Sequence, residues 1–254
     1  MLIVLSPAKA LNFTTPEKPA PMTTPMMAAD IAELAVTAKA LTVRQLKSLM
    51  DLSDNLATLN RERFQAFDPA MEDGLQAAFA FNGDVYSGLK ARELDKKGLA
   101  YAQDHIRILS GLYGLLRPLD LIQAYRLEMR IPLENARGRD LYAFWGDRLT
   151  RAVNQLLAAG PGAPVLVNLA SGEYFQALDG RALAGRVITP VFQELKPGGY
   201  KVISFHAKRA RGLMARYAIR KRAEDPELLK RFREEGYAFD RKASEADRWF
   251  FRRG

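Results

Sequence analysis

The residues of this chain with the clearest chemical potential are the cations near its C-terminus. Between Lys196 and Arg222 the sequence contains nine Lys and Arg and no Asp or Glu. Of the chain's 38 Lys and Arg, 17 lie in residues 196–254, together with 8 of its 29 Asp and Glu, so the rest of the chain carries 21 of each sign. A run of cations without acids attracts phosphates, so we expect nucleic acid as a partner. The alternative is a solvated helix face that serves solubility.

Most of this run fits a basic amphipathic helix over residues 207–223. The apolar positions are Ala210, Leu213, Met214 and Tyr217, and the cations between them include Lys208, Arg209, Arg211 and Arg216. Apolar residues at i, i+3, i+4 and i+7 would pack on the core and leave the cations for phosphates. The helix lacks the Asn or Gln of an adenine-reading face, so we expect phosphate contacts and little sequence preference.

A second candidate for phosphate binding is the segment Gly111-Leu-Tyr-Gly114. A predicted helix over residues 99–109 must turn at these glycines, and a second short helix would follow up to Pro118. The pattern resembles the helix-hairpin-helix DNA-binding motif, although its hairpin is one residue longer than usual. Its amides would hold a phosphate that Arg117 could also reach. The structural alternative is that the glycines only cap a helix and allow close packing.

Composition excludes several kinds of site. The chain has no Cys, which rules out disulfides, Cys zinc sites, iron–sulfur clusters and a thiol nucleophile. With only His105 and His206, sites built on several imidazoles are excluded, and direct iron sequestration would rely on carboxylates. We assign no metal, no cofactor and no catalytic residue. The apolar run at residues 1–6 is too short for a signal peptide or membrane span, so we expect a cytoplasmic protein and no membrane contact.

These groups must be positioned by a mixed α/β fold. We predict a single α+β domain over residues 1–254, with a central sheet, surrounding helices and the helix-hairpin-helix-like element. Strands are predicted at residues 2–5, 165–169, 186–192, 201–205 and 249–253, and helices at 27–40, 42–51, 53–67 and 138–159. The first strand should pair with the later ones, which draws the termini together. The oligomeric state does not follow from the sequence.

Several motifs are spread along nearly the whole chain, namely residues 5–9 (LSPAK), 81–86 (FNGDVY), 109–120, 125–129 (YRLEM), 168–171 (NLAS), 173–175 (EYF), 190–192, Ser204 and 207–214. Together they resemble the peroxide stress protein YaaA family. The chain departs from the family pattern at Ala124, Arg130 and His206, none of which replaces a charged motif residue.

The resemblance implies a compact family-specific fold with a positively charged cleft that binds double-stranded DNA, with distorted or branched DNA as further partners. It also implies a role in limiting peroxide damage, through low levels of unincorporated iron. The residues expected to contact nucleic acid are Lys9, Gly111, Tyr113, Gly114, Arg117, Lys208, Arg209, Arg211 and Arg216.

The same motifs allow an enzyme as the alternative function. Lys9 follows the first strand and a Ser-Pro turn, so its amine should emerge at a strand end, where α/β folds place ligands. The side chains that could converge on it are Asn82, Asp84, Tyr86, Ser110, Arg117, Arg126, Glu128, Asn168, Ser171, Glu173 and Lys208. Lys9 would clamp a phosphate or act as a base, and the glutamates would carry protons or hold a divalent cation. The substrate would be phosphorylated or nucleotide-like. The structural alternative is a set of buried ion pairs, such as Arg126 with Glu128.

Overall fold

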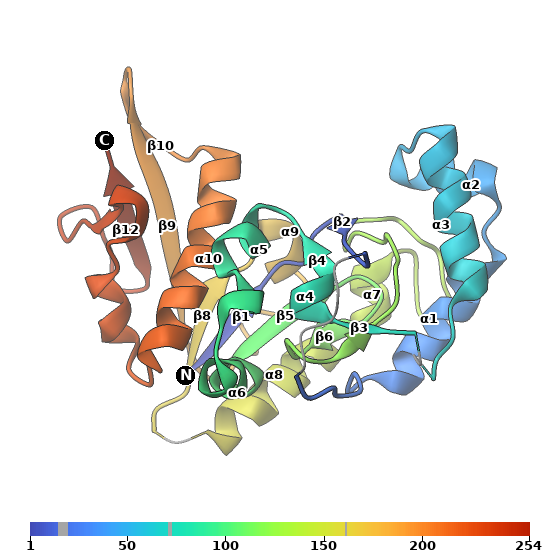
Figure 1. Cartoon of the computed structure of the whole chain (residues 1–254), viewed down its shortest axis with the longest axis horizontal. Coiled ribbons are helices and arrows are strands. Elements are labelled where there is room, and N and C mark those ends of the chain that lie inside the picture. The colour runs from blue at the N-terminus through green and yellow to red at the C-terminus, as the bar shows by residue number, and fades with distance from the viewer. Residues whose placement is uncertain (15–19, 71–72, 161) are drawn as a thin grey trace.

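A mixed sheet of eight strands organises the computed structural model, which describes residues 1–14, 20–70, 73–160 and 162–254 (Figure 1). The parallel strands are β1 (Leu2–Leu5), β5 (Ile106–Ser110), β8 (Val165–Leu169), β9 (Arg186–Lys196) and β12 (Arg248–Arg253). Antiparallel strands β6 (Gly114–Leu116), β10 (Gly199–Lys201) and β11 (Ala238–Phe239) complete the sheet. The predicted mixed α/β class with a central sheet is confirmed.

The order of the parallel strands reverses direction between β1 and β8. In space they run β5-β1-β8-β9-β12, which by sequence is 2-1-3-4-5, a common doubly wound order. The strand that follows β1 lies on one side of it, and the next strand lies on the other. Crossover connections therefore diverge between β1 and β8, and a crevice forms outside their carboxyl ends. The topology makes this crevice the first place to look for a ligand.

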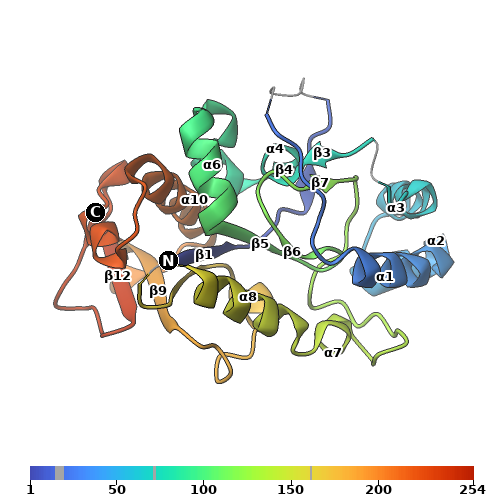
Figure 2. The same ribbon diagram turned by 90° about the horizontal axis from the view of Figure 1, so that it is seen from below.

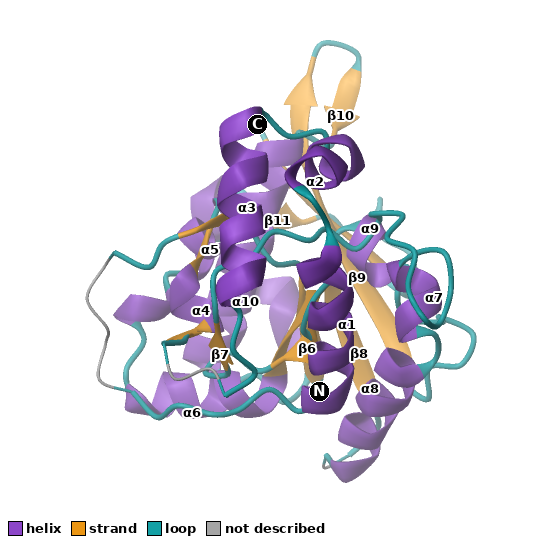
Figure 3. Ribbon diagram, turned by 90° about the vertical axis from the view of Figure 1, so that its right-hand side faces the viewer, coloured by secondary structure: helices purple, strands orange, loops and turns teal. Residues whose placement is uncertain are grey.

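Helices cover both faces of the sheet. Figure 2 shows α6 (Lys96–His105) and α10 (Ser204–Lys221) on one face and α8 (Arg148–Ala159) on the other. Beyond β6, at one end of the molecule, α1 (Ala28–Ala40), α2 (Val43–Met50) and α3 (Asp54–Ala66) pack together (Figure 3). The short elements are β2 (Ala10–Leu11), β3 (Leu75–Gln76), α4 (Ala77–Ala80), β4 (Phe81–Asn82), α5 (Asp84–Leu89), η1 (Ala91–Glu93), β7 (Leu121–Ile122), α7 (Leu141–Trp145), α9 (Gly172–Phe175), η2 (Pro226–Arg231) and η3 (Glu234–Gly236).

Local capping chemistry explains which helix predictions succeed. Thr42 caps α2 through a reciprocal capping box with Gln45, and Ser53 accepts a hydrogen bond from the Leu56 amide at the start of α3. The single helix predicted over residues 138–159 is instead two helices, because Gly146 adopts a positive φ of 50° between α7 and α8.

The helix-hairpin-helix interpretation is wrong. The helix before the glycines ends at His105, and the next residues form β5, whose five residues are all buried beside β1. After the turn the chain returns antiparallel as β6, so the glycines belong to a β-hairpin. Ile106 and Ile108 are β-branched residues in a strand buried on both faces, and this burial overrides the helical periodicity that continues from α6.

The glycines of this hairpin are needed for packing. A Cβ at Gly111 would collide with the Leu127 carbonyl oxygen, while Gly114 has a φ of 68° and lies against the Trp145 ring. Tyr113 is fully buried, and its amide donates to the Ser110 Oγ over 3.0 Å. The Tyr113 amide is therefore engaged within the protein.

A second pair of glycines brings two helices into backbone contact. A Cβ at Gly88 of α5 would collide with the carbonyl oxygen of Arg209, and one at Gly212 of α10 would collide with that of Val85. Only hydrogen fits between the two backbones at these points. The contact holds α10, with its cations, directly against α5.

We therefore expect Gly212→Ala to lower the free energy of unfolding by about 3 kcal/mol, because overpacking outweighs the gain in helix propensity of about 1 kcal/mol. Urea denaturation measures the change. Gly180→Ala is the matched control, since a Cβ there meets nothing within 4 Å. Equal stability of Gly212→Ala and wild type would contradict the close contact.

Candidate anion site at the carboxyl edge of the sheet

Two serines join the ends of β1 and β8 at the divergence point. The Ser171 amide donates to the Ser6 Oγ over 2.8 Å, and the two hydroxyl oxygens lie 3.3 Å apart. The Tyr86 hydroxyl donates to the Ser6 carbonyl oxygen over 3.1 Å. Each serine directly follows a buried strand or lies within two residues of its end, so the sheet itself sets their positions.

A short antiparallel pair brings Lys9 beside the residues around α5. Directly after Lys9, β2 pairs with β4 in the register Ala10 to Asn82. Asn82 and Asp84 therefore lie next to the turn that carries Lys9, although more than 70 residues separate them in sequence. The Lys9 side chain remains half exposed, so it can reach a ligand.

The buried carboxylate Glu128 balances the positive charge on this side. Its Oε1 lies 2.8 Å from the Lys9 Nζ and 3.3 Å from an Arg126 Nη. Burial opposes ionisation of Glu128, but the two cations outweigh it and hold the pKa of the carboxyl below its usual 4.5. The Glu128 Oε2 and the Arg126 Nε are buried and have no hydrogen-bond partner. This pair thus retains unused hydrogen-bonding capacity.

The opposite wall carries Lys208 and Arg211, one turn apart on α10. Neither forms an ion pair with a carboxylate of the residues that the structure describes. Partial burial lowers the pKa of the Arg211 guanidinium, which has lost water without gaining an acid. A desolvated cation without a partner favours a bound anion.

Together these walls enclose a pocket of about 330 Å³. It is lined by Ser6, Pro7, Ala8, Lys9, Ala10, Asn82, Gly83, Asp84, Val85, Glu128, Ser171, Glu173, Tyr174, Lys208 and Arg211. Lys208 and Arg211 line it from α10, and Lys9 adds a third cation among the carboxylates and amides of the other elements. The arrangement suits a ligand with a phosphate at one end and hydrogen-bond donors at the other.

Most of the residues predicted to converge on Lys9 do meet there. The predicted residues that line the pocket with Lys9 are Asn82, Asp84, Glu128, Ser171, Glu173 and Lys208. Tyr86 lies behind the pocket through its bond to the Ser6 carbonyl, and Arg126 lines an adjoining pocket that shares Lys9 and Glu128.

Three residues predicted near Lys9 or the hairpin have other surroundings. Asn168 is buried in β8, where its Oδ1 accepts a hydrogen bond from the Ala170 amide. Ser110 is fully buried, with its Oγ 2.6 Å from the Tyr125 hydroxyl. Arg117 is held by the buried Asp120 carboxylate, with 2.9 Å between its Nε and Oδ1, and also donates to the Thr24 carbonyl. Its guanidinium is therefore engaged within the protein.

Ser6 and Tyr174 belong to the pocket but are absent from the residues predicted as candidates. Ser6 is the first residue after β1, so the rule that ligands bind at strand ends could have identified it. Tyr174 is buried, and burial raises its pKa, so it stays a neutral phenol in the pocket wall.

Within the described ranges, no group of three or more His, Asp and Glu gathers in a way that could hold a metal ion. No helix of that part of the chain is long and apolar enough to cross a membrane.

The fold and the pocket define a doubly wound α/β protein with a charged site at its strand-divergence point. The chain belongs to the peroxide stress protein YaaA family, whose model matches residues 1–243. It is 59% identical over 253 residues to a UPF0246 protein of Phenylobacterium zucineum, covering 100% of this chain and 95% of that protein. UPF0246 proteins of Caulobacter vibrioides and Paraburkholderia xenovorans are 55% and 54% identical, covering all of this chain and 99% and 98% of those proteins. The family resemblance predicted from the motifs is confirmed.

The charge balance at Glu128 predicts a pH-dependent contribution to stability. We expect Glu128→Gln to lower the free energy of unfolding at pH 7 by about 1.5–3 kcal/mol, since charged hydrogen bonds to two cations are lost. Folding lowers the pKa of this carboxyl, so the unfolded chain takes up the proton first as the pH falls. The difference between wild type and variant should therefore shrink below pH 4.5 and vanish below the lowered native pKa.

Urea denaturation of both proteins between pH 3 and pH 7 measures this difference. The exposed Glu134 supplies the control, because Glu134→Gln removes one carboxylate without touching the pocket. A difference at Glu128 that is constant with pH would show that the carboxylate is not stabilised by folding.

Proposed function

We propose that this protein binds double-stranded DNA through its phosphates, largely without sequence preference, in a response to peroxide stress. The observation that carries the proposal is the acid-free run of cations from Lys196 to Arg222, most of which lies on α10. The 18 residues of α10 extend about 27 Å, the length of about eight base pairs. Membership of the YaaA family supports the role in peroxide stress.

The free cations of this run support phosphate contacts. Arg209 is paired with Glu235 and Arg216 with Glu93, so these two would have to leave their partners to reach DNA. Among described residues, no carboxylate forms an ion pair with the other cations that follow Lys196, namely Lys201, Lys208, Arg211, Arg220, Lys221 and Arg222. Neutralising phosphates with such cations releases counterions, which drives binding irrespective of base sequence.

A second candidate function is supported by the pocket. A cavity of nucleotide size at the divergence point of a doubly wound sheet, with the unpaired Arg211 on its wall, favours a phosphorylated small molecule. Lys9 would contact the phosphate, and Glu173 would accept hydrogen bonds from the rest of the ligand. The two functions share Lys208 and Arg211, but the pocket does not include the cations at the far end of α10.

For DNA binding we expect the logarithm of the affinity for a duplex to fall linearly with the logarithm of salt concentration, with a slope of about −5 for six phosphate contacts. Arg211→Gln and Lys221→Gln should each flatten the slope by about one, equally for unrelated sequences. Fluorescence anisotropy at several salt concentrations measures it. Arg44→Gln on the distant helix α2 removes the same charge and should leave the slope unchanged. A wild-type slope near zero would refute the proposal.

For the pocket we expect adenosine monophosphate to bind wild type in a calorimetric titration and Arg211→Gln to bind it at least tenfold more weakly, because a charged hydrogen bond is lost. Lys221→Gln is the discriminating control. It should weaken DNA binding while leaving nucleotide binding intact, since Lys221 lies outside the pocket. Nucleotide binding that responds equally to both substitutions would remove the support for a separate pocket function.

A further inference from the structure

Unpaired charges of both signs line the pocket at the carboxyl edge of the sheet. Besides the ion pair of Lys9 with Glu128, its charged lining consists of the cations Lys208 and Arg211 and the carboxylates Asp84 and Glu173. No ion pair joins any of these four side chains to another charged group among the residues that the structure describes. The pocket has a volume of only about 330 Å³, so opposite charges remain separate within a small space.

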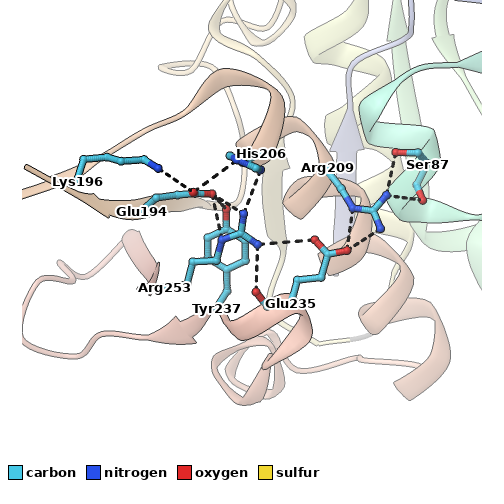
Figure 4. A network of polar contacts seen from close by, with 8 residues as sticks. All are labelled: Ser87, Glu194, Lys196, His206, Arg209, Glu235, Tyr237 and Arg253. Atoms are coloured by element: carbon cyan, nitrogen blue, oxygen red, sulfur yellow. Dashed lines mark hydrogen bonds and ion pairs between the residues drawn. The ribbon is translucent and has the colours of Figure 1, made fainter.

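Arg211 marks the end of the pocket that suits an anion. Two residues earlier on α10, Arg209 already pairs with Glu235 over 2.6 Å and donates to the Ser87 Oγ over 3.2 Å, as Figure 4 shows. Arg211 has no such partner. Burial lowers the pKa of its guanidinium, and no acid offsets that effect. A phosphate would supply the acceptors that this partly buried guanidinium lacks.

Glu173 of α9 marks the end that suits a cation. Its Oε1 accepts one long hydrogen bond, 3.4 Å, from the Arg130 amide, and its Oε2 accepts none from the described part of the chain. Burial raises the pKa of the neighbouring Tyr174 phenol, and the charges of Glu173 and Glu128 raise it further. Negative charge therefore gathers around this phenol, where an ammonium group would find a free acceptor.

The second unpaired carboxylate, Asp84, acts on a cation outside the pocket lining. The hydrogen bond from Arg209 to Glu235 raises the pKa of Arg209, and the charge of Asp84 adds to this effect. Asp84 is also exposed to solvent, whereas Glu173 is half-buried. Of the two carboxylates, Glu173 thus gains more from a cationic ligand.

Much of the remaining lining carries no polar side chain. Apart from Ser6, Asn82 and Ser171, it consists of small or apolar residues and the Tyr174 phenol, namely Pro7, Ala8, Ala10, Gly83, Val85 and Tyr174. A Cβ at Gly83 would lie 3.1 Å from the Ala8 Cβ, so the two backbone segments approach closely here. A short aliphatic chain fits such a surface, because it leaves no polar group without a partner.

We propose that the ligand of this pocket is a phosphorylated amine, whose phosphate binds Arg211 and Lys208 and whose ammonium group binds Glu173. The inference rests on the pocket function proposed above and names its substrate class. A ligand that carries only a phosphate would leave Glu173 unpaired beside it, and a ligand that carries only an amine would leave Arg211 unpaired. A molecule with both groups pairs both residues.

The competing arrangement is a magnesium ion held between Glu173 and the phosphate, since magnesium commonly binds one or two carboxylates together with substrate phosphates. In the described ranges, no cluster of three or more His, Asp and Glu favours a metal ion. An ammonium group requires only the one carboxylate. The two arrangements differ in their need for a divalent cation, which can be measured.

Two ligands that differ only in the amine test the proposal. O-phosphoethanolamine and ethyl phosphate share the phosphate and the two-carbon chain, and calorimetric titration of the full chain without divalent cations measures both affinities. Phosphoethanolamine should bind at least tenfold more tightly, since it adds a charged hydrogen bond to a half-buried carboxylate.

Three substitutions assign the two ends. Glu173→Gln should bring the ratio of the two affinities close to one without weakening ethyl phosphate. Arg211→Gln should weaken both ligands tenfold or more and preserve their ratio, because the phosphate is common to both. Glu134→Gln removes an exposed carboxylate outside this pocket and is the matched control, with both affinities unchanged.

The outcomes separate the amine from the pocket function itself. Equal affinities of wild type for the two ligands would overturn the amine and leave the pocket function in place, as would binding of adenosine monophosphate but of neither small ligand. If none of the three binds, the pocket function fails and the amine fails with it. A preference for phosphoethanolamine that persists in Glu173→Gln would overturn the assigned contact. Ethyl phosphate binding that requires both magnesium and Glu173 would show that the carboxylate holds a metal ion and overturn the amine.

Discussion

The backbone contact between α5 and α10 is the constraint on which the rest of the charged surface depends. Gly88 and Gly212 leave no room for a side chain between the two helices, so α10 has one position relative to α5. From that position Lys208 and Arg211 reach over the ends of β1 and β8 and complete the pocket. The start of α10, and with it the direction from which β10 arrives, is set by the same contact.

The surface around α10 is positively charged for two reasons. It carries many cations, and two of its acids are buried and paired. Glu128 and Glu194 lie within the basic region, yet each is buried and held ionised by cations or hydroxyl donors around it. Buried carboxylates require such partners, because an uncompensated buried charge is strongly destabilising. The groups that pair with Glu194 include side chains of α10 and β12. The same contacts therefore neutralise Glu194 and join β9, α10 and β12.

The sequence predicted those helices and strands whose formation depends on neighbouring residues. It failed where burial against distant parts of the chain determines the secondary structure. The apolar run of β1 and the caps Thr42 and Ser53 could be predicted because neighbouring residues determine them. The helix expected to continue to Leu109 becomes β5 because Ile106 lies opposite Ile3, a contact that no local window contains. The candidate residues around Lys9 could be named because Lys9 follows a strand and the others belong to the motifs of the resembled family. The ion pair of Arg117 with Asp120 and the two-stranded ribbon of β9 and β10 depend on contacts that only the folded chain reveals.

Glu194 and Arg253 are 59 residues apart in sequence, so during synthesis Glu194 is made well before its partner. At a synthesis rate of about 5–20 residues per second, Arg253 is made about 3–12 s after Glu194. During that interval the growing chain already contains the ribbon and the cations of α10, while Glu194 lacks its arginine partner and β9 lacks its neighbour β12. A nascent chain would thus carry the ribbon with an acid at its base that still lacks its arginine partner. The complete basic surface becomes available when the last strand docks.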